Sequence, residues 1–212
     1  EGIDPDVAVF TEPASCACHG IDVLELRAGS TVLVVGAGPT GLLLAQLLGV
    51  NGASHVTVAA TKQFKLDVAG RLGIDRTVLI PRGDVADAGA VLRAASPSGD
   101  GYDYVIEATG AAEIGTMCLS LVRDGGTVLI YGVMGETDRV SFSPFDVFRR
   151  EITIKGSFAE ILSFNTAIGY LRSGKLRTEG IVSHRFGLDD YGKAIATLAG
   201  DPTAHKVVIQ VS

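Results

Sequence analysis

Thr31-Val-Leu-Val-Val-Gly-Ala-Gly-Pro-Thr-Gly-Leu-Leu-Leu-Ala45 joins a strand pattern, three glycines and a helix pattern without interruption. The β-favouring residues before Gly36 predict a strand, and the leucines after Gly41 predict a helix. Gly36 permits a tight turn with positive φ. Gly38 has no Cβ, so a ligand can approach its backbone, and Gly41 lets the helix lie close against the strand. The stretch therefore predicts a strand–turn–helix unit that is open to a ligand.

The start of the predicted helix is suited to binding phosphate. Pro39 fits the first helical position, where its missing N–H is no loss. The free backbone amides there, together with the helix dipole, attract an anion. Because strand, glycines and helix follow the order of a dinucleotide-binding turn, we predict that this turn binds a pyrophosphate through Gly36, Gly38, Pro39 and Gly41. The alternative is a glycine-rich turn without a ligand.

Composition limits the classes of protein to consider. The chain has 212 residues, which suits one large domain or one domain with attachments, and its 47% hydrophobic residues and 27 glycines suit a packed α/β protein. The formal net charge is -6 and no block of Lys and Arg occurs, so we expect no nucleic-acid partner. A phosphate-bearing cofactor needs only local positive potential, so the overall acidity does not exclude one.

Cysteine usage and hydropathy predict a cytoplasmic protein. Cys16, Cys18 and Cys118 cannot all pair, and the first two are too close for a typical structural disulfide. We therefore expect reduced thiols, as in the cytosol. The apolar run Leu42–Val50 is too short to cross a bilayer, and we expect neither a signal peptide nor a membrane partner.

Strand and helix patterns alternate along most of the chain. The strands are continuous apolar runs, which are typical of a parallel sheet covered on both faces. The pattern predicts a doubly wound α/β sheet of six strands, the Rossmann arrangement, with Gly125-Gly126 as the turn before the fifth strand. We expect strands over 31–35, 55–59, 76–80, 102–106, 127–131 and 151–155, and helices over about 39–50, 62–72, 84–95, 111–121, 143–148 and 160–171.

The two ends of the chain lie outside this alternation. Residues 1–28, with a helix expected over Ala14–Leu26, are interpreted as a connector from another domain, and residues 29–175 as the dinucleotide-binding domain. Residues 176–212 contain extended pieces that have no place in a six-stranded sheet, and we expect them to pack partly on another domain. His55 and His205 precede strands and are expected on the surface.

The end of the second strand indicates which dinucleotide is preferred. A site for NAD usually has an acidic residue there that binds the adenosine ribose, and Ala59-Ala-Thr-Lys62 contains none. Lys62 and Lys65 supply positive charge, and Thr61 offers a hydrogen bond to a 2′-phosphate. The residues favour NADP over NAD. Alternatively, both lysines are simply solvated.

Several motifs together resemble the medium-chain, zinc-type alcohol and polyol dehydrogenases, most closely their sorbitol and arabinitol branch. The resemblance covers nearly all of the chain. It is carried by Glu12-Pro-Ala-Ser-Cys-Ala-Cys-His19, Gly36-Ala-Gly-Pro-Thr-Gly41, Ile106-Glu-Ala-Thr-Gly110, Gly125-Gly-Thr-Val-Leu-Ile-Tyr-Gly132, Ile154-Lys-Gly-Ser-Phe158, Val182-Ser-His-Arg-Phe186 and Lys206-Val-Val-Ile209.

The resemblance implies hydride transfer between a small-molecule secondary alcohol or polyol and the nicotinamide of NADP or NAD. A zinc ion in the complete enzyme lowers the pKa of the bound alcohol. Most of its ligands come from an N-terminal GroES-like catalytic domain, which we expect to be missing here, so this chain alone is expected to be inactive. Glu12 is the candidate metal contact. Cys16 and Cys18 lack the usual zinc spacing and are expected to be small buried residues.

The family also implies which residues contact the coenzyme. One departure from the polyol branch follows Phe158, where relatives often carry Arg-Tyr and this chain carries Ala159-Glu160, which puts a sugar-alcohol substrate in question. Besides the glycine turn, the implied contacts are Thr40 at the pyrophosphate, Ala60, Lys62 and Lys65 at the adenosine ribose, Thr109, Gly110, Val133, Ser157 and Phe158 at the nicotinamide, and Lys206 near the pyrophosphate.

Two alternatives to a zinc-dependent polyol dehydrogenase stay open. One is a zinc-free oxidoreductase that resembles quinone reductases, against which Glu12-Pro13 argues weakly. The other is a non-catalytic dinucleotide-binding module. We also expect a homo-oligomer, because Ile152–Ile154 is predicted to form an apolar strand at the edge of the sheet, and such edges pair with symmetry mates.

Overall fold

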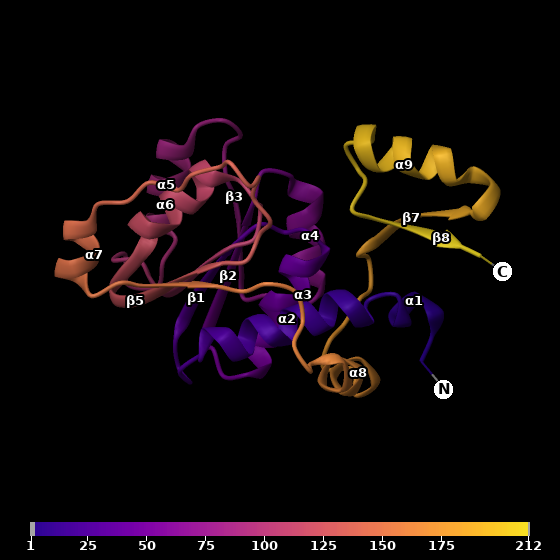
Figure 1. The fold of residues 1–212 in the computed structure, drawn as a ribbon, viewed down its shortest axis with the longest axis horizontal. Coiled ribbons are helices and arrows are strands. Elements are labelled where there is room, and N and C mark those ends of the chain that lie inside the picture. Colours follow the sequence, from indigo (N-terminus) through magenta and orange to yellow (C-terminus); the bar gives the residue numbers. More distant parts are fainter. Residues whose placement is uncertain (1–2, 212) are drawn as a thin grey trace.

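A computed structural model describes residues 3–211, and its centre is a six-stranded parallel sheet (Figure 1). The strand order is β3-β2-β1-β4-β5-β6, which confirms the doubly wound arrangement. The order reverses at β1, so a crevice opens beyond the carboxyl ends of β1 and β4. The strands are β1 (Thr31–Val35), β2 (His55–Ala60), β3 (Arg76–Leu79), β4 (Tyr102–Glu107), β5 (Val122–Ile130) and β6 (Thr153–Gly156).

Helices cover both faces of the sheet, because alternate residues of each strand point to opposite faces. Val32 and Val34 pack in the same hydrophobic core as residues of α2, α3, α4 and α8, whereas Leu33 and Val35 pack with residues of α5 and α6 (Figure 1). The helices are α1 (Pro5–Ala8), α2 (Thr11–Leu24), α3 (Pro39–Val50), α4 (Gln63–Arg71), α5 (Val85–Ala94), α6 (Ala112–Leu121), α7 (Pro144–Arg150), α8 (Phe164–Arg172) and α9 (Tyr191–Gly200).

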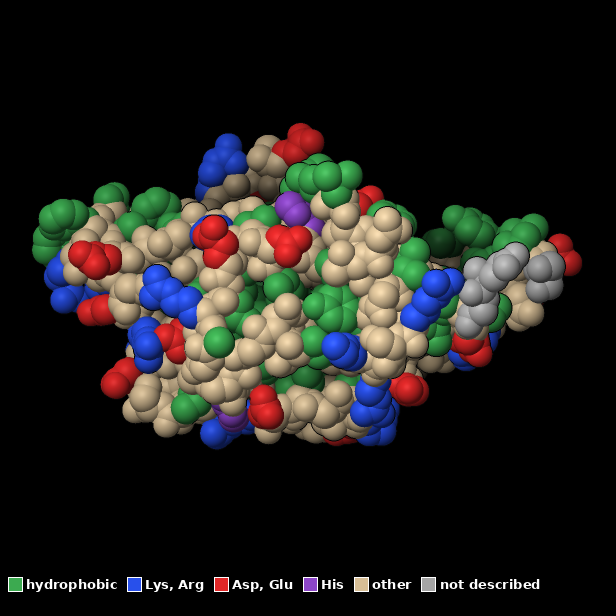
Figure 2. Space-filling view, turned by 90° about the horizontal axis from the view of Figure 1, so that it is seen from below, with side chains coloured by type: hydrophobic (Ala, Val, Ile, Leu, Met, Phe, Trp, Pro, Cys, Tyr) green, Lys and Arg blue, Asp and Glu red, His purple; other side chains and the backbone are tan. Residues whose placement is uncertain are grey.

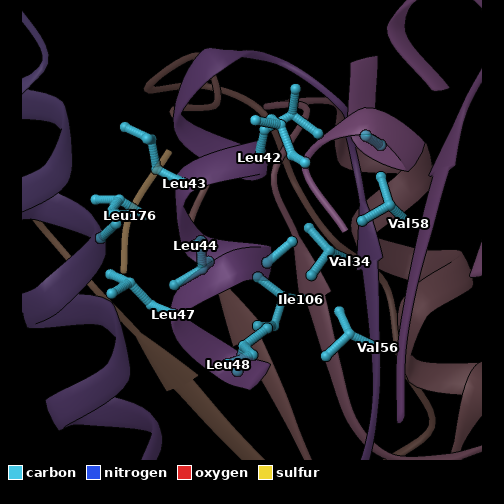
Figure 3. Packing of buried hydrophobic residues seen from close by; sticks show 14 of the residues in the cluster. Val34, Leu42, Leu43, Leu44, Leu47, Leu48, Val56, Val58, Ile106 and Leu176 are labelled. Carbon is cyan, nitrogen blue, oxygen red and sulfur yellow. The ribbon is translucent and has the colours of Figure 1, made fainter. Parts of the chain in front are cut away.

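Helix α3 is buried on nearly all sides, which fixes the position of its first turn. Leu42 and Leu48 point toward strand residues such as Ile106, while Leu43 and Leu47 point toward Leu176 (Figure 3). All of these side chains are almost completely buried. A helix that is apolar all round lies inside a protein rather than at its surface. The amides at the start of α3 are therefore held rigidly at the end of β1.

Two expected element boundaries were wrong. Gly125 and Gly126 lie inside β5 rather than before it, because β5 begins at Val122 and its register against β4 shifts before Thr127. The helix expected from Glu160 begins only at Phe164. Ala159 and Leu162 both have φ of 54°, a left-handed conformation that interrupts a helix.

The C-terminal residues form a small lobe beside the six-stranded sheet (Figure 1). Strands β7 (Val182–Gly187) and β8 (Lys206–Gln210) pair in parallel, with a 3-10 turn (Leu188–Asp190) and α9 between them. These residues, 182–210, are called the C-terminal lobe below. Their separation from the main sheet confirms that the late extended pieces lie outside it. The division at 28 and 175 stays a prediction.

Within the described residues, no helix combines the length and apolar character needed to span a bilayer.

Candidate functional site

The glycine turn lies at the carboxyl end of β1, where the strand order reverses. Gly36 has φ of 125°, and a Cβ on it would lie 2.6 Å from the carbonyl oxygen of Ala108. A Cβ on Gly41 would lie 2.3 Å from the carbonyl oxygen of Gly36. A Cβ on Gly38 would meet no atom within 4 Å, so it would project into open space. Two glycines are thus required by the fold, and the third leaves room above the turn.

Pro39 is the first residue of α3, and no side chain caps this helix start. The amides of the first turn therefore keep their capacity to donate hydrogen bonds to a ligand. Thr40 and Gly41 follow in the same turn and line a cavity described below. The predicted residues of the turn thus lie together at the carboxyl end of β1.

A cavity of about 410 Å³ opens on one side of this turn. It extends from the ends of β1 and β2 to the loop after β3. Among the residues predicted to contact a coenzyme, it is lined by Gly36, Gly38, Ala60, Thr61, Lys62, Lys65 and Thr109. We call it the ribose-side cavity, because it contains the predicted contacts of the adenosine ribose.

Three cationic side chains reach the ribose-side cavity. Lys62 Nζ donates a hydrogen bond to the carbonyl oxygen of Pro202 at 3.0 Å. Burial, and then the neighbouring Lys62, lower the pKa of Lys65. Arg82, in the loop after β3, also lines the cavity, and the sequence analysis missed it. A signal was present, since carboxyl ends of neighbouring parallel strands meet at one edge of a sheet and Arg82 closely follows such a strand.

A second cavity, of about 540 Å³, lies on the other side of the turn. It is called the nicotinamide-side cavity below. Ala108 and Thr109 line both cavities, so the two spaces adjoin. Of the predicted residues, this cavity is lined by Glu12, Thr40, Gly41, Thr109, Val133, Ser157 and Phe158.

A completely buried carboxylate holds the loop between the two cavities. Glu107 Oε1 accepts hydrogen bonds from the amide of Thr109 at 2.6 Å and from the amide of Gly110 at 3.0 Å, and it also contacts the Thr109 hydroxyl. Gly110 has φ of 78°, and a Cβ there would lie 2.4 Å from the carbonyl oxygen of Val133. Glu107 was not predicted as a functional residue, although it precedes the predicted pair Thr109-Gly110.

An acidic and thiol cluster lies at the wall of the nicotinamide-side cavity. Glu12, Cys16 and Glu160 each offer a ligand atom, and these atoms all lie within 4.8 Å of one another. Cys16 Sγ lies 3.3 Å from Glu12 Oε1 and 3.5 Å from Glu160 Oε2. Burial, followed by the two carboxylates, raises the pKa of Cys16 to about 12. Cys18 is buried as expected, but Cys16 is only partly buried and lines the cavity.

Tyr131 lies next to this cluster. Its buried hydroxyl has no hydrogen-bond partner among the described residues. Burial raises the pKa of Tyr131, and the nearby Cys16 and Glu12 contribute in the same direction. The phenol therefore stays protonated and keeps a donor available at the cavity wall.

His205, the residue before β8, contacts the glycine turn, whereas Lys206, the first residue of β8, lines neither of the two cavities. Lys206 Nζ lies 5.2 Å from the ring centroid of Phe10, and burial lowers its pKa. The surface position expected for His205 was wrong, because its side chain is only 6% exposed. Its Nε2 lies 2.9 Å from the carbonyl oxygen of Ala37. The cause is tertiary, since the C-terminal lobe packs this residue against a turn that is distant in sequence.

Comparisons with known proteins agree with this geometry. The profile of the family described as zinc-binding dehydrogenase matches residues 39–170. The chain is 44% identical over 200 residues to D-arabinitol dehydrogenase 1 of Uromyces fabae, covering 94% of this chain and 57% of that protein. It is 32% identical to D-altritol 5-dehydrogenase of Agrobacterium fabrum, covering 95% of this chain and 58% of that protein.

A solved structure is similar over nearly the whole chain. It is a zinc-binding dehydrogenase from Sinorhizobium meliloti 1021 bound to NADP, with a TM-score of 0.89, 33% identity, and coverage of 98% of this chain and 60% of that one. The chain thus spans less than two thirds of the length of these relatives. The matched family profile covers more than half of the chain and agrees with the motifs that carried the resemblance. The chain belongs to the zinc-binding dehydrogenase family.

Proposed function

We propose that this chain is the coenzyme-binding part of a dehydrogenase that transfers hydride between a secondary alcohol or polyol and NADP. The observation that carries the proposal is the glycine turn, with its open space at Gly38 and an adjoining cavity on each side. The names of the relatives that act on arabinitol and altritol support a polyol substrate. The NADP-bound neighbour supports the coenzyme.

The coenzyme would extend from one cavity to the other across the turn. Amides of the turn and of the first turn of α3 would bind the pyrophosphate, with Lys206 contributing positive charge from the side of Phe10. The cations Lys62, Lys65 and Arg82 would surround a 2′-phosphate, with Thr61 as a hydrogen-bond donor. Residues of the nicotinamide-side cavity would hold the reacting ring: Thr109, Val133, Ser157 and Phe158.

Titration of the purified chain with NADP and NAD tests this proposal. We expect NADP to release heat on binding and to raise the melting temperature. At one hundred times its Kd, a ligand stabilises the folded state by about 2.7 kcal/mol. For a chain of this size, that corresponds to a shift of roughly 5–10 °C. If neither coenzyme gives heat or a shift, the proposed function is wrong.

Glu12 is the residue that we propose as a zinc contact, with Cys16 and Glu160 beside it. Their oxygen and sulfur atoms suit zinc chemically and lie close enough together to share one ion. When bound, zinc would act as a Lewis acid that lowers the pKa of the substrate alcohol. Glu12 is exposed to the cavity, so its carboxylate can meet an ion and a substrate there.

Replacing Glu12 by glutamine should weaken zinc binding by the chain. Even residues that only support a metal ligand typically contribute tenfold or more to affinity, so we expect a loss of at least about tenfold. Equilibrium dialysis against zinc, with metal analysis, measures the effect. Glu136→Gln, which changes an exposed acidic residue elsewhere, is the control. Equal zinc affinity in both variants would contradict the role of Glu12.

We also propose that two copies of the chain pair along β6. This strand forms the edge of the sheet, and Ile154 on it is 40% exposed. Figure 2 shows hydrophobic side chains gathered at the nearby end of the molecule that carries α7, where Phe145 is 66% and Phe148 is 79% exposed. Light scattering at micromolar concentration should give a dimer, and Ile154→Lys should give a monomer. A monomeric unmodified chain would contradict this.

The location that we propose is the cytoplasm. It is supported by the free state of Cys16, Cys18 and Cys118 in the structure.

A further inference from the structure

The loop between α9 and β8 contacts the coenzyme site at two points. His205 Nε2 lies 2.9 Å from the carbonyl oxygen of Ala37, which stands between the first two glycines of the turn. The carbonyl oxygen of Pro202, in the same loop, accepts a hydrogen bond from Lys62 Nζ at 3.0 Å. Ala37 and Lys62 both line the ribose-side cavity. The C-terminal lobe is therefore attached directly to residues that form this cavity.

The geometry defines the state of the His205 ring. A carbonyl oxygen only accepts hydrogen bonds, so Nε2 must carry a proton, and in the neutral ring Nδ1 is then the unprotonated nitrogen. Nδ1 is buried and has no partner among the described residues. Phe64 packs edge-on against the ring, with centroids 6.1 Å apart. Burial, and then Lys65, lower the pKa of His205 to about 4, so the ring is neutral near pH 7 and acts only as a donor to Ala37.

The bond to Ala37 has a direct consequence for the glycine turn. A peptide unit is planar and trans, so its C=O and its N–H point in opposite directions. The carbonyl of Ala37 shares a peptide unit with the amide of Gly38. A donor that fixes the carbonyl on one side therefore fixes the Gly38 N–H on the other side. Glycines flank Ala37, and without such a bond this peptide would have unusual freedom to rotate.

We propose that His205 is a positioning residue for the coenzyme, which holds the Ala37–Gly38 peptide in the orientation that binds pyrophosphate. The inference rests on the proposed coenzyme site and adds to it a residue from the C-terminal lobe. Because the turn is ordered before the ligand arrives, less entropy is lost on binding. The pyrophosphate is common to NADP and NAD, so a substitution of His205 should lower the affinity for both coenzymes equally. A substitution at the 2′-phosphate should instead lower the affinity for NADP alone.

Two substitutions of similar polarity separate positioning from packing. In His205→Gln, the side-chain amide nitrogen reaches about as far as Nε2 and can donate to Ala37. In His205→Asn, the amide is one bond shorter and cannot reach. We expect the Asn variant to bind NADP and NAD about tenfold more weakly than the unmodified chain, and the Gln variant to stay within about twofold. If the Gln and Asn variants bind both coenzymes alike, the inference is wrong.

Two measurements without coenzyme distinguish failure of this inference from failure of the proposed function. Hydrogen exchange should be faster in segments 36–44 and 203–210 of the Asn variant than in the Gln variant. In the unmodified chain, nitrogen NMR of the ring should show the proton on Nε2. If both results are obtained but neither coenzyme binds, the contact orders the turn while the proposed function fails, and the role of His205 toward a coenzyme fails with it. A proton on Nδ1, or equal exchange in the two variants, would overturn the inference.

Discussion

Replacing Gly38 by alanine is expected to remove most of the coenzyme affinity while leaving the fold intact. The backbone of Gly38 has φ of −71° and ψ of 169°, which any residue can adopt. A Cβ there meets no atom within 4 Å. The added methyl group would occupy the space where the pyrophosphate approaches the amides. Losing a charge-assisted hydrogen bond costs roughly 1.5–3 kcal/mol, so we expect the affinity for both coenzymes to fall by about tenfold to a hundredfold.

Gly49→Ala is the matched control for this experiment. Gly49 lies in the same helix, is exposed, and also has open space around its Cβ position. Alanine there should stabilise the fold by about 0.5–1 kcal/mol and leave binding unchanged. Calorimetric titration and thermal unfolding of both variants give the comparison. Unchanged coenzyme affinity in Gly38→Ala would mean that the ligand does not lie over the turn. Gly36 and Gly41 are unsuitable, because a Cβ on either would collide with backbone atoms.

The double substitution of Lys62 and Lys65 by alanine should separate the two coenzymes. Both side chains line the ribose-side cavity, and no acidic residue stands at the end of β2. A 2′-phosphate would bind them through charge-assisted hydrogen bonds, and NAD has no such group. We expect the affinity for NADP to fall by roughly a hundredfold and that for NAD by less than about threefold.

Competitive titration with NADP and NAD measures this difference. The double substitution Lys175→Ala with Lys193→Ala, which removes two exposed lysines outside the ribose-side cavity, controls for the change in net charge. Lys62 also donates to Pro202, so its loss loosens one attachment of the C-terminal lobe. That effect should lower the affinity for NADP and for NAD by the same factor. It can therefore be separated from the additional loss of affinity that only NADP shows. Equal losses for the two coenzymes would refute a 2′-phosphate site at these lysines.

The elements of the main sheet follow from local patterns in the sequence. Continuous apolar strands that alternate with helices predict a parallel sheet, and the structure contains all six strands in doubly wound order. The boundaries of helices and strands differ from those expected where the backbone adopts a conformation that the residue types do not predict. Examples are the left-handed conformations of Ala159 and Leu162, which delay α8, and the register shift inside β5.

Some residues of the candidate site were not predictable from spacing. Glu160 was noted only as a departure from the polyol branch, yet its carboxylate lies 3.5 Å from Cys16 Sγ, across 144 residues of sequence. Arg82 lines the ribose-side cavity, and its place just after β3 was the one available signal for it. Such contacts depend on how loops and side chains are oriented after the elements have packed.

The strand–turn–helix unit, the order of the elements and the residues of the glycine turn could all be predicted from the amino-acid sequence. These depend on steric and hydrogen-bonding preferences of neighbouring residues, which are local properties. Two contacts arise only when distant elements pack: His205 meets Ala37 across 168 residues, and the ligand atoms of Glu12, Cys16 and Glu160 lie within 4.8 Å of one another. Burial of apolar side chains drives that packing. The hydrophobic effect is non-directional, so the sequence carries no pattern that marks which distant residues will meet.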